Sequence, residues 1–147
     1  MKKLIMSLLL SIVLTSASVF VSCGGQTQNT SDVDLLRSLY VQYVFGDQLL
    51  DSAYVHTHFS SEMVKFLKDS YEYDCESNDC YAVWLFRTSA QDGPMPKSEI
   101  SEIKPLKDHW YEVSYLDMGI SGITKLRVID GQITAIELDK SYDEMSE

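Results

Sequence analysis

Basic residues are scarce in this sequence of 147 residues, which has 12 Lys and Arg against 22 Asp and Glu and a formal net charge of −10. A surface this acidic repels phosphate backbones, because nucleic-acid binding depends on Lys and Arg side chains that neutralise phosphates. The same charge disfavours binding to anionic lipid headgroups. We therefore expect no nucleic-acid partner and no direct binding of the folded domain to an anionic bilayer.

Motifs that carry catalysis or bind cofactors are also absent. The sequence contains no phosphate-binding Gly-rich loop and no Gly-x-Ser-x-Gly element for a serine nucleophile. It lacks the Cys-x-x-Cys pair that suits redox catalysis. Glu112 and Asp117 lie on an expected strand, and nothing marks the desolvated pocket that a general acid or base needs. We therefore predict a protein that is not an enzyme and has no cofactor.

The N-terminal residues indicate where the protein is located in the cell. Lys2 and Lys3 precede an apolar run over residues 4–21, which is typical of a secretory signal peptide, here residues 1–22. An uncleaved transmembrane anchor is the alternative, because the run is long enough to cross a bilayer. The segment FVSCG, residues 20–24, resembles the lipobox of bacterial lipoproteins. This resemblance implies that Cys23 is lipidated and becomes the first residue of the mature chain.

The lipobox resemblance also implies a location. Gly24 stands where an Asp retains enterobacterial lipoproteins in the inner membrane, so the resemblance implies the outer membrane. No acidic run of the kind found in surface-exported Bacteroidetes lipoproteins follows Cys23, which favours the periplasmic face over the cell surface. Residues 23–30 are rich in Gly, Gln, Asn and Thr and are expected to form a flexible tether. The membrane partner is thus reached through lipid on Cys23.

The other two cysteines, Cys75 and Cys80, are five residues apart. In an oxidising compartment such an isolated pair is most simply a disulfide, with two free thiols as the alternative. Between them lies an acidic stretch whose oxygen atoms could bind Ca²⁺. Its spacing does not fit an EF-hand loop, so we favour a solvated acidic loop.

Helices are predicted in the first half of the mature chain. Apolar residues recur at helical spacing over residues 32–45, which predicts a helix capped by Ser31 and ended by Gly46. A second helix is expected after Ser60 or Ser61, with Met63 among its apolar residues. Residues 81–86 form a continuous apolar run that fits either a buried strand or a short helix.

Four short antiparallel strands are predicted over residues 99–138. The clearest signal is Asp130-Gly131 between two alternating apolar runs, because a two-residue type I′ turn needs positive φ at both positions. A regular register places Val128 opposite Ile133 and Leu126 opposite Ala135. Farther from the turn the apolar face switches, which fits a curved sheet or a bulge. We expect the third strand to begin at residue 123, after a turn marked by Gly119 and Gly122.

The order of two helices, an irregular middle and a meander predicts an α+β domain over residues 31–140, followed by an acidic tail over residues 141–147. This order, with the loop AQD at residues 90–92, resembles the nuclear-transport-factor-2-like family and, more narrowly, small Bacteroidetes-type lipoproteins that carry such a domain. The resemblance implies a cystatin-like cone, in which N-terminal helices pack on a curved antiparallel sheet, with a pocket at its open end. It implies no activity, because the same cone serves isomerases, dehydratases and non-catalytic binding modules.

Aromatic residues are the candidates for a binding site. Trp84, Trp110, Tyr111 and Tyr115 join large apolar bodies to polar handles and could line a pocket or an interface, with core packing as the alternative. The segment containing His56 and His58 is a weak metal candidate, because on a strand both rings would point the same way. No third ligand is visible nearby, so we expect no metal.

These observations predict an outer-membrane-tethered, non-catalytic binding or assembly module of the cell envelope, with an envelope protein as its partner. A small apolar ligand in the cone is the alternative, and an isomerase- or hydrolase-like activity is the weakest hypothesis. An interior filled by the protein's own aromatic side chains, beside an exposed apolar patch, favours a protein partner. A deep empty pocket favours a small ligand, and a pKa-shifted carboxylate or His within it favours an enzyme.

Overall fold

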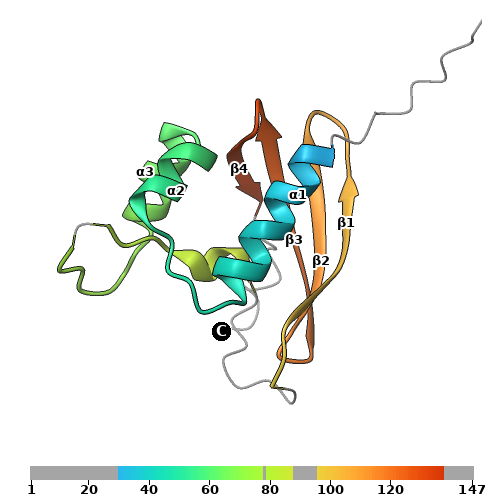
Figure 1. Ribbon diagram of the computed structural model, residues 1–147, viewed down its shortest axis with the longest axis horizontal. Helices are drawn as coiled ribbons and strands as arrows, with labels where there is room; N and C mark the ends of the chain where they lie inside the picture. The colour runs from blue at the N-terminus through green and yellow to red at the C-terminus, as the bar shows by residue number, and fades with distance from the viewer. Residues whose placement is uncertain (1–29, 78, 88–95, 138–147) are drawn as a thin grey trace, which may run out of the picture.

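The computed structural model describes residues 30–77, 79–87 and 96–137, with helices in the first half and a sheet in the second (Figure 1). The α+β class predicted from the sequence is confirmed. The elements in chain order are α1 (Thr30–Ser38), the π-helix η1 (Leu39–Val44), α2 (Ser52–His58), α3 (Ser61–Asp69), the 3₁₀-helix η2 (Val83–Phe86), β1 (Glu99–Pro105), β2 (Trp110–Asp117), β3 (Ile120–Ile129) and β4 (Gln132–Glu137).

The sheet is an antiparallel meander in the order β1-β2-β3-β4, as the sequence predicted. Its three hairpins share one kind of turn, in which both central residues have positive φ, as a two-residue type I′ turn requires. The Asp-Gly turn is therefore confirmed, and two further turns of this kind accompany it. The central pairs are Asp108 and His109, Met118 and Gly119, and Asp130 and Gly131.

The register of β3 and β4 contains the bulge that the switch of apolar face indicated. Val128 lies opposite Ile133, as predicted. Leu126 lies opposite Ile136 and not opposite Ala135, because the register shifts between Arg127 and Val128. The extra residue in β4 allows both apolar pairs to face the core.

The turn between β2 and β3 lies earlier than predicted. The strand begins at Ile120 and not at residue 123, since Met118 and Gly119 form the turn. Gly122, expected in the turn, lies in β3 opposite Tyr115. The sequence did not indicate this turn because Met is seldom found at positive φ.

The helical segment over residues 30–44 matches the first predicted helix, but its ends differ. Ser31, predicted as the cap, lies inside α1. Gly46 does not adopt the positive φ of a C′ glycine. A Cβ at this position would lie 2.4 Å from the carbonyl oxygen of Gln42, so the absence of a side chain permits a close backbone approach.

Helix α2 was not predicted. It begins after Asp51, whose Oδ1 accepts a hydrogen bond of 2.7 Å from the backbone N–H of Tyr54. The predicted cap of α3 is confirmed, because Ser60 Oγ accepts a hydrogen bond of 3.3 Å from the N–H of Met63. The apolar run over residues 81–86 ends in η2 and is not a strand.

The core lies between the helices and one face of the sheet. In Figure 1, α1 runs across the sheet while α2 and α3 lie beside β4. The backbone N–H of Ser60 donates a 3.0 Å hydrogen bond to the carbonyl of Ile133, which fixes the junction of α2 and α3 to β4. Fully buried aliphatic residues come from both layers, namely Leu36, Leu39, Val55, Leu67, Val113, Leu126, Val128 and Ile133.

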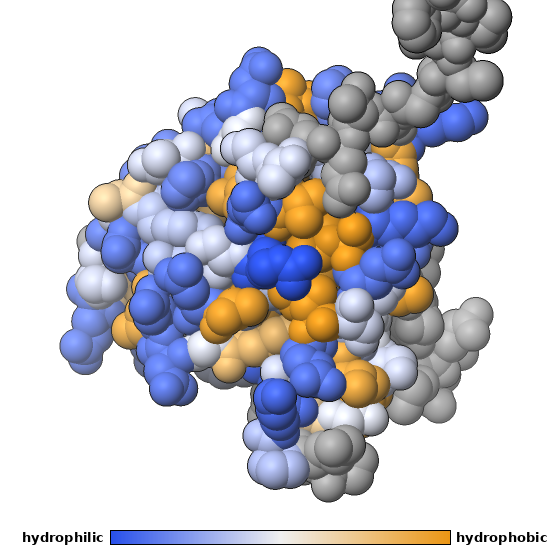
Figure 2. Space-filling view, turned by 45° about the vertical axis from the view of Figure 1, so that its right-hand side comes forward, coloured by the Kyte–Doolittle hydropathy of each residue, from blue (hydrophilic) through white to orange (hydrophobic). Residues whose placement is uncertain are grey.

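The opposite face of the sheet carries a row of charged side chains, beside the half-buried Trp110 and the exposed Ile123. Lys104, Glu112, Lys125 and Glu137 face one another across the four strands, with charges of alternating sign. Lys125 Nζ lies 3.0 Å from Glu137 Oε1. A row of this kind is typical of a solvated sheet face. Figure 2 shows another side of the molecule, where apolar side chains gather near the centre around a strongly hydrophilic one and hydrophilic side chains lie at the periphery.

Candidate functional site

The space between the helices and the sheet contains the protein's own aromatic rings. Tyr40 is fully buried, and its ring centroid lies 5.5 Å from those of both Phe45 and Tyr115. The buried rings of Phe59 and Phe86 have centroids 6.0 Å apart. Burial raises the pKa of the Tyr40 hydroxyl well above its usual value. Tyr115, a candidate pocket or interface residue, packs against Tyr40 and is itself buried, so it lies in the core.

Two buried tyrosine hydroxyls join separate elements of the fold. Tyr111 in β2 donates a 2.9 Å hydrogen bond to Oδ2 of Asp32 in α1. The hydroxyls of Tyr115 and Thr124 lie 3.0 Å apart, and Thr124 donates to the carbonyl of Phe86 at 3.3 Å. Tyr111 thus holds α1 against the sheet, whereas Tyr115 links β2 to Thr124 in β3, whose hydroxyl in turn holds η2.

Asp117 at the end of β2 is a fully buried carboxylate. Arg87 contacts both of its oxygens, with Nε 2.9 Å from Oδ2 and Nη2 2.5 Å from Oδ1. Ser98 donates to Oδ1 at 2.9 Å, and Arg87 Nη1 also donates to the carbonyl of Val44 at 3.2 Å. Because a bidentate guanidinium and a hydroxyl bind the carboxylate, this cluster fits a structural role that connects the end of η1 with the sheet.

A shallow groove of about 310 Å³ lies between α1, α2 and the β3–β4 turn. The Tyr54 ring on its wall lies 4.2 Å from the Tyr43 ring and 4.5 Å from the His58 ring, centroid to centroid. The Tyr54 hydroxyl is buried without a well-formed hydrogen bond, and burial raises its pKa to about 12, although the nearby Ser38 side chain acts to lower it. The groove could hold a small, partly polar molecule. Its lining residues are Ser31, Asp34, Leu35, Ser38, Tyr54, His58 and Gly131.

The geometry predicted for His56 and His58 is wrong, because both lie in α2 and not on a strand. Residues two apart on a helix point in different directions, so these rings do not converge. His56 is exposed, and His58 stacks on Tyr54. Within residues 30–77, 79–87 and 96–137, no three side chains of the His, Cys, Asp or Glu type are placed to hold a metal ion.

An exposed group of aromatic rings lies where α3 leads into the following loop. Tyr71, Tyr73 and Trp84, which we call the aromatic cluster, contact one another with ring centroids 5.3 to 5.9 Å apart. Tyr73 is 67% exposed and Trp84 37%. Two of the three ring pairs are edge-to-face, an arrangement that favours a defined orientation. The molecule therefore presents a preformed aromatic surface to solvent.

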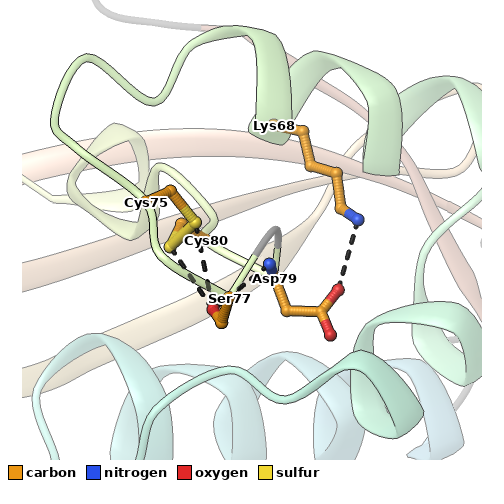
Figure 3. Close-up of a disulfide and its surroundings, with 5 residues drawn as sticks. All are labelled: Lys68, Cys75, Ser77, Asp79 and Cys80. Carbon is orange, nitrogen blue, oxygen red and sulfur yellow. Dashed lines mark hydrogen bonds and ion pairs between the residues drawn. A yellow bond between two sulfur atoms is a disulfide. The ribbon is translucent and has the colours of Figure 1, made fainter.

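The loop beside the aromatic cluster is closed by the predicted disulfide, which is confirmed (Figure 3). The Cys75 and Cys80 sulfurs are joined, with Cα atoms 6.0 Å apart. Ser77 Oγ lies 3.9 Å from one sulfur and 3.8 Å from the other, and it accepts a hydrogen bond from the N–H of Asp79. These bonds restrict the loop that projects beside α3 (Figure 1).

Lys68 attaches the same loop to α3. Its Nζ lies 3.3 Å from Asp79 Oδ1 and 5.3 Å from the centre of the Tyr81 ring. Figure 3 marks the contact between Lys68 and Asp79 with a dashed line. A carboxylate and an aromatic face thus share one ammonium group. Because Tyr81 is buried, this contact lies at the edge of the core.

The structure separates the four aromatic candidates. Trp84 is an exposed member of the aromatic cluster, whereas Tyr111 and Tyr115 are buried. Trp110 is half-buried at the start of β2, opposite Arg127. The contacts of Trp84 with Tyr71 and Tyr73 were not predicted from the sequence. Their alternation with acidic residues before Cys75 could have indicated an exposed segment, since no apolar periodicity supports a core element there.

Several predictions fall outside the described residues. The signal peptide, the tether up to residue 29, the lipidation of Cys23 and the tail over residues 141–147 lie there. So does the loop at residues 90–92. In the described part of the chain no helix is long and apolar enough to cross a membrane.

Comparison of the chain with protein-family models, curated proteins and solved structures gave no match. The resemblance to the nuclear-transport-factor-2-like family therefore stays a prediction. Any assignment of function depends on the chemistry of the surfaces described above.

Proposed function

We propose that this protein is a lipid-tethered docking module of a bacterial cell envelope, which binds another envelope protein through the aromatic cluster. Acyl chains on Cys23 would hold it at the periplasmic face of the outer membrane, and the short tether would keep the domain near the bilayer. In this proposal the fold is a cone similar to those of the nuclear-transport-factor-2-like family, with an interior used for packing.

The observation that carries the proposal is the distribution of the aromatic rings. Tyr40, Tyr115 and Phe86 fill the interior, whereas Tyr73 and Trp84 remain exposed. Exposed Tyr and Trp side chains are enriched at protein interfaces, because they offer a large rigid area and a polar end. In the part of the chain that the structure describes, the two buried carboxylates have partners, Asp32 with Tyr111 and Asp117 with Arg87, which weakens the enzyme hypothesis.

The test is photo-crosslinking in cells that produce the full chain. A photoreactive amino acid replaces Tyr73 in one variant and Leu49, an 89% exposed residue outside the cluster, in the other. We expect a discrete crosslinked partner from position 73 that is lost on adding Trp84→Ala and is absent from position 49. Equal crosslinking from both positions, or none from position 73, would rule out this docking surface.

The membrane attachment is tested separately. Cys23→Ala should release the protein from membranes, because no acyl chain could be added. A variant that remains membrane-bound would show that the anchor is not a lipid on Cys23.

Small-molecule binding is the second candidate, favoured by the buried hydroxyl of Tyr54, which makes no well-formed hydrogen bond in the groove. Native mass spectrometry of protein extracted gently from its own envelope would show a bound small mass that Tyr54→Phe and His58→Ala reduce. If the natural protein and the variants all carry no bound small molecule, the groove is not a ligand-binding site.

A further inference from the structure

We infer that the partner's docking segment is basic and places a Lys or Arg side chain on the exposed rings of the aromatic cluster. This inference rests on the proposed docking function and specifies the chemistry of the partner. Three independent features of the region support it, namely exposed rings, unneutralised acidic groups and an internal example of the same contact.

The exposed rings can accept a cation. The faces of Trp and Tyr carry negative electrostatic potential and attract ammonium and guanidinium groups. Tyr73 stands at 80° to Trp84 and at 75° to Tyr71, so neighbouring rings support one another's orientation. A guanidinium group suits such a surface, because it is planar, weakly hydrated and stacks on aromatic faces.

The surrounding charge is negative. Residues 69–80 contain five Asp and Glu and no Lys or Arg. In the described part of the chain, Asp69 pairs with Lys65, and Asp79 pairs with Lys68. No ion pair there involves the other three, which alternate with the aromatic cluster or follow it, namely Glu72, Asp74 and Glu76. Their charge raises the local concentration of a basic partner.

The same region already binds one cation in the proposed manner. Lys68 lies between the ring of Tyr81 and the carboxylate of Asp79, at 5.3 Å and 3.3 Å. Ring and carboxylate therefore act together on an ammonium group within this loop. A basic partner would repeat this contact on the outer side, where Trp84 and Tyr73 supply the rings.

The net charge of the chain argues against two other occupants. At −10, a second copy would bring like charge against the acidic loop. An anionic lipid surface is disfavoured for the same reason. A basic protein segment is the occupant that satisfies both the rings and the carboxylates.

The probe is a fluorescein-labelled synthetic peptide of alternating Arg and Gly, and its control replaces each Arg with neutral citrulline. Fluorescence anisotropy measures binding to the full chain purified in detergent. We expect the Arg peptide to bind and the citrulline peptide to bind far more weakly. Tyr73→Ala and Trp84→Ala should each weaken binding by about fivefold to thirtyfold, whereas Leu49→Ala should not change it.

A charge-matched pair of variants separates a defined site from general attraction. One carries Glu72→Gln, Asp74→Asn and Glu76→Gln. The other removes the same charge elsewhere, with Glu62→Gln, Glu99→Gln and Glu102→Gln. The first should weaken binding by at least about tenfold at low salt and the second by much less, because the interaction is local. Equal weakening by both triple variants would overturn the inference.

The outcomes distinguish this inference from the docking function. If the citrulline peptide binds as well as the Arg peptide, the partner is not recognised through positive charge, and the inference is wrong. The crosslink from position 73 could still be found in that case, so the docking surface would stand. Tyr73→Ala is the safer variant, since its side chain is 67% exposed, and thermal unfolding confirms that each variant is folded.

Discussion

Arg87 holds the carboxylate of Asp117, thirty residues later in the chain, in a fork of two hydrogen bonds. The carboxylate is fully buried, and the arginine side chain is 28% exposed. Removing Arg87 leaves a buried carboxylate without its positively charged partner. We therefore expect Arg87→Met to lower the free energy of unfolding by about 3 kcal/mol, as measured by urea denaturation.

A matched comparison uses Lys65 and Asp69, an ion pair one turn apart on α3 with side chains 75% and 62% exposed. Lys65→Met should cost less than about 1 kcal/mol, because water screens that pair. The double variant Arg87→Met with Asp117→Leu should recover part of the loss, since no charge then remains buried. Equal costs for Arg87→Met and Lys65→Met would contradict the structural role of the buried pair.

The sequence allows the burial of Asp117 to be predicted, but not its pairing with Arg87. Asp117 follows Tyr111, Val113 and Tyr115 at intervals of two, so strand alternation places it on the buried face. Arg87 carries no such signal, because it follows a short 3₁₀-helix and lies in no helix or strand whose period would give its direction. Local patterns identify an inward-facing carboxylate, but only tertiary structure identifies its partner.

The turns show the same limit. Asp130-Gly131 could be read directly, since both residues tolerate positive φ. Met118 adopts φ of 51° because the pairing of β2 with β3 fixes its position, and its own preference does not predict that.

Helix α2 was missed because its seven residues bury only Val55, which leaves little helical periodicity to detect. The cap at Asp51 was the remaining signal.

Gly46 is predicted to tolerate no side chain. A Cβ would lie 2.4 Å from the Gln42 carbonyl oxygen and 2.6 Å from that of Val41, so the end of η1 would have to move. We expect Gly46→Ala to lower the free energy of unfolding by about 1–3 kcal/mol. Gly131→Ala serves as the comparison, because no atom lies within 4 Å of its added Cβ and only its φ of +76° is unfavourable. Gly131→Asn should be close to neutral, whereas Gly46→Asn should be as damaging as Gly46→Ala.

The disulfide should contribute to stability and to docking. Replacing both Cys75 and Cys80 with Ser should lower the free energy of unfolding by about 2 kcal/mol, because the bond closes only a short loop. A reducing agent should destabilise the natural protein by a similar amount and leave the double variant unchanged. Two free thiols in oxidised protein, detected by mass analysis without reduction, would contradict this prediction. Binding of the Arg peptide should also weaken in the double variant, since the acidic loop loses its constraint.

Tyr54 should make the protein less stable in alkali. Burial raises its pKa in the folded protein to about 12 from the ordinary value of 10. Between these two pH values the unfolded chain ionises its phenol while the folded protein keeps it neutral, so the unfolded state releases more protons and stability falls as pH rises. Tyr54→Phe removes this contribution and should flatten the decline.

The measurement is urea denaturation at several pH values from 9 upward, beside an absorbance titration of phenolate between the ordinary pKa of 10 and the raised pKa of about 12. At neutral pH Tyr54→Phe should cost little, because the interaction that it would remove, with the Ser38 side chain, falls short of a well-formed hydrogen bond. Tyr40→Phe should reduce the alkaline decline in the same direction, since burial also raises the pKa of Tyr40. If Tyr54→Phe loses stability in alkali as steeply as the natural protein, the Tyr54 phenol is not the group responsible, and the groove beside it is more open to water than its buried hydroxyl indicates.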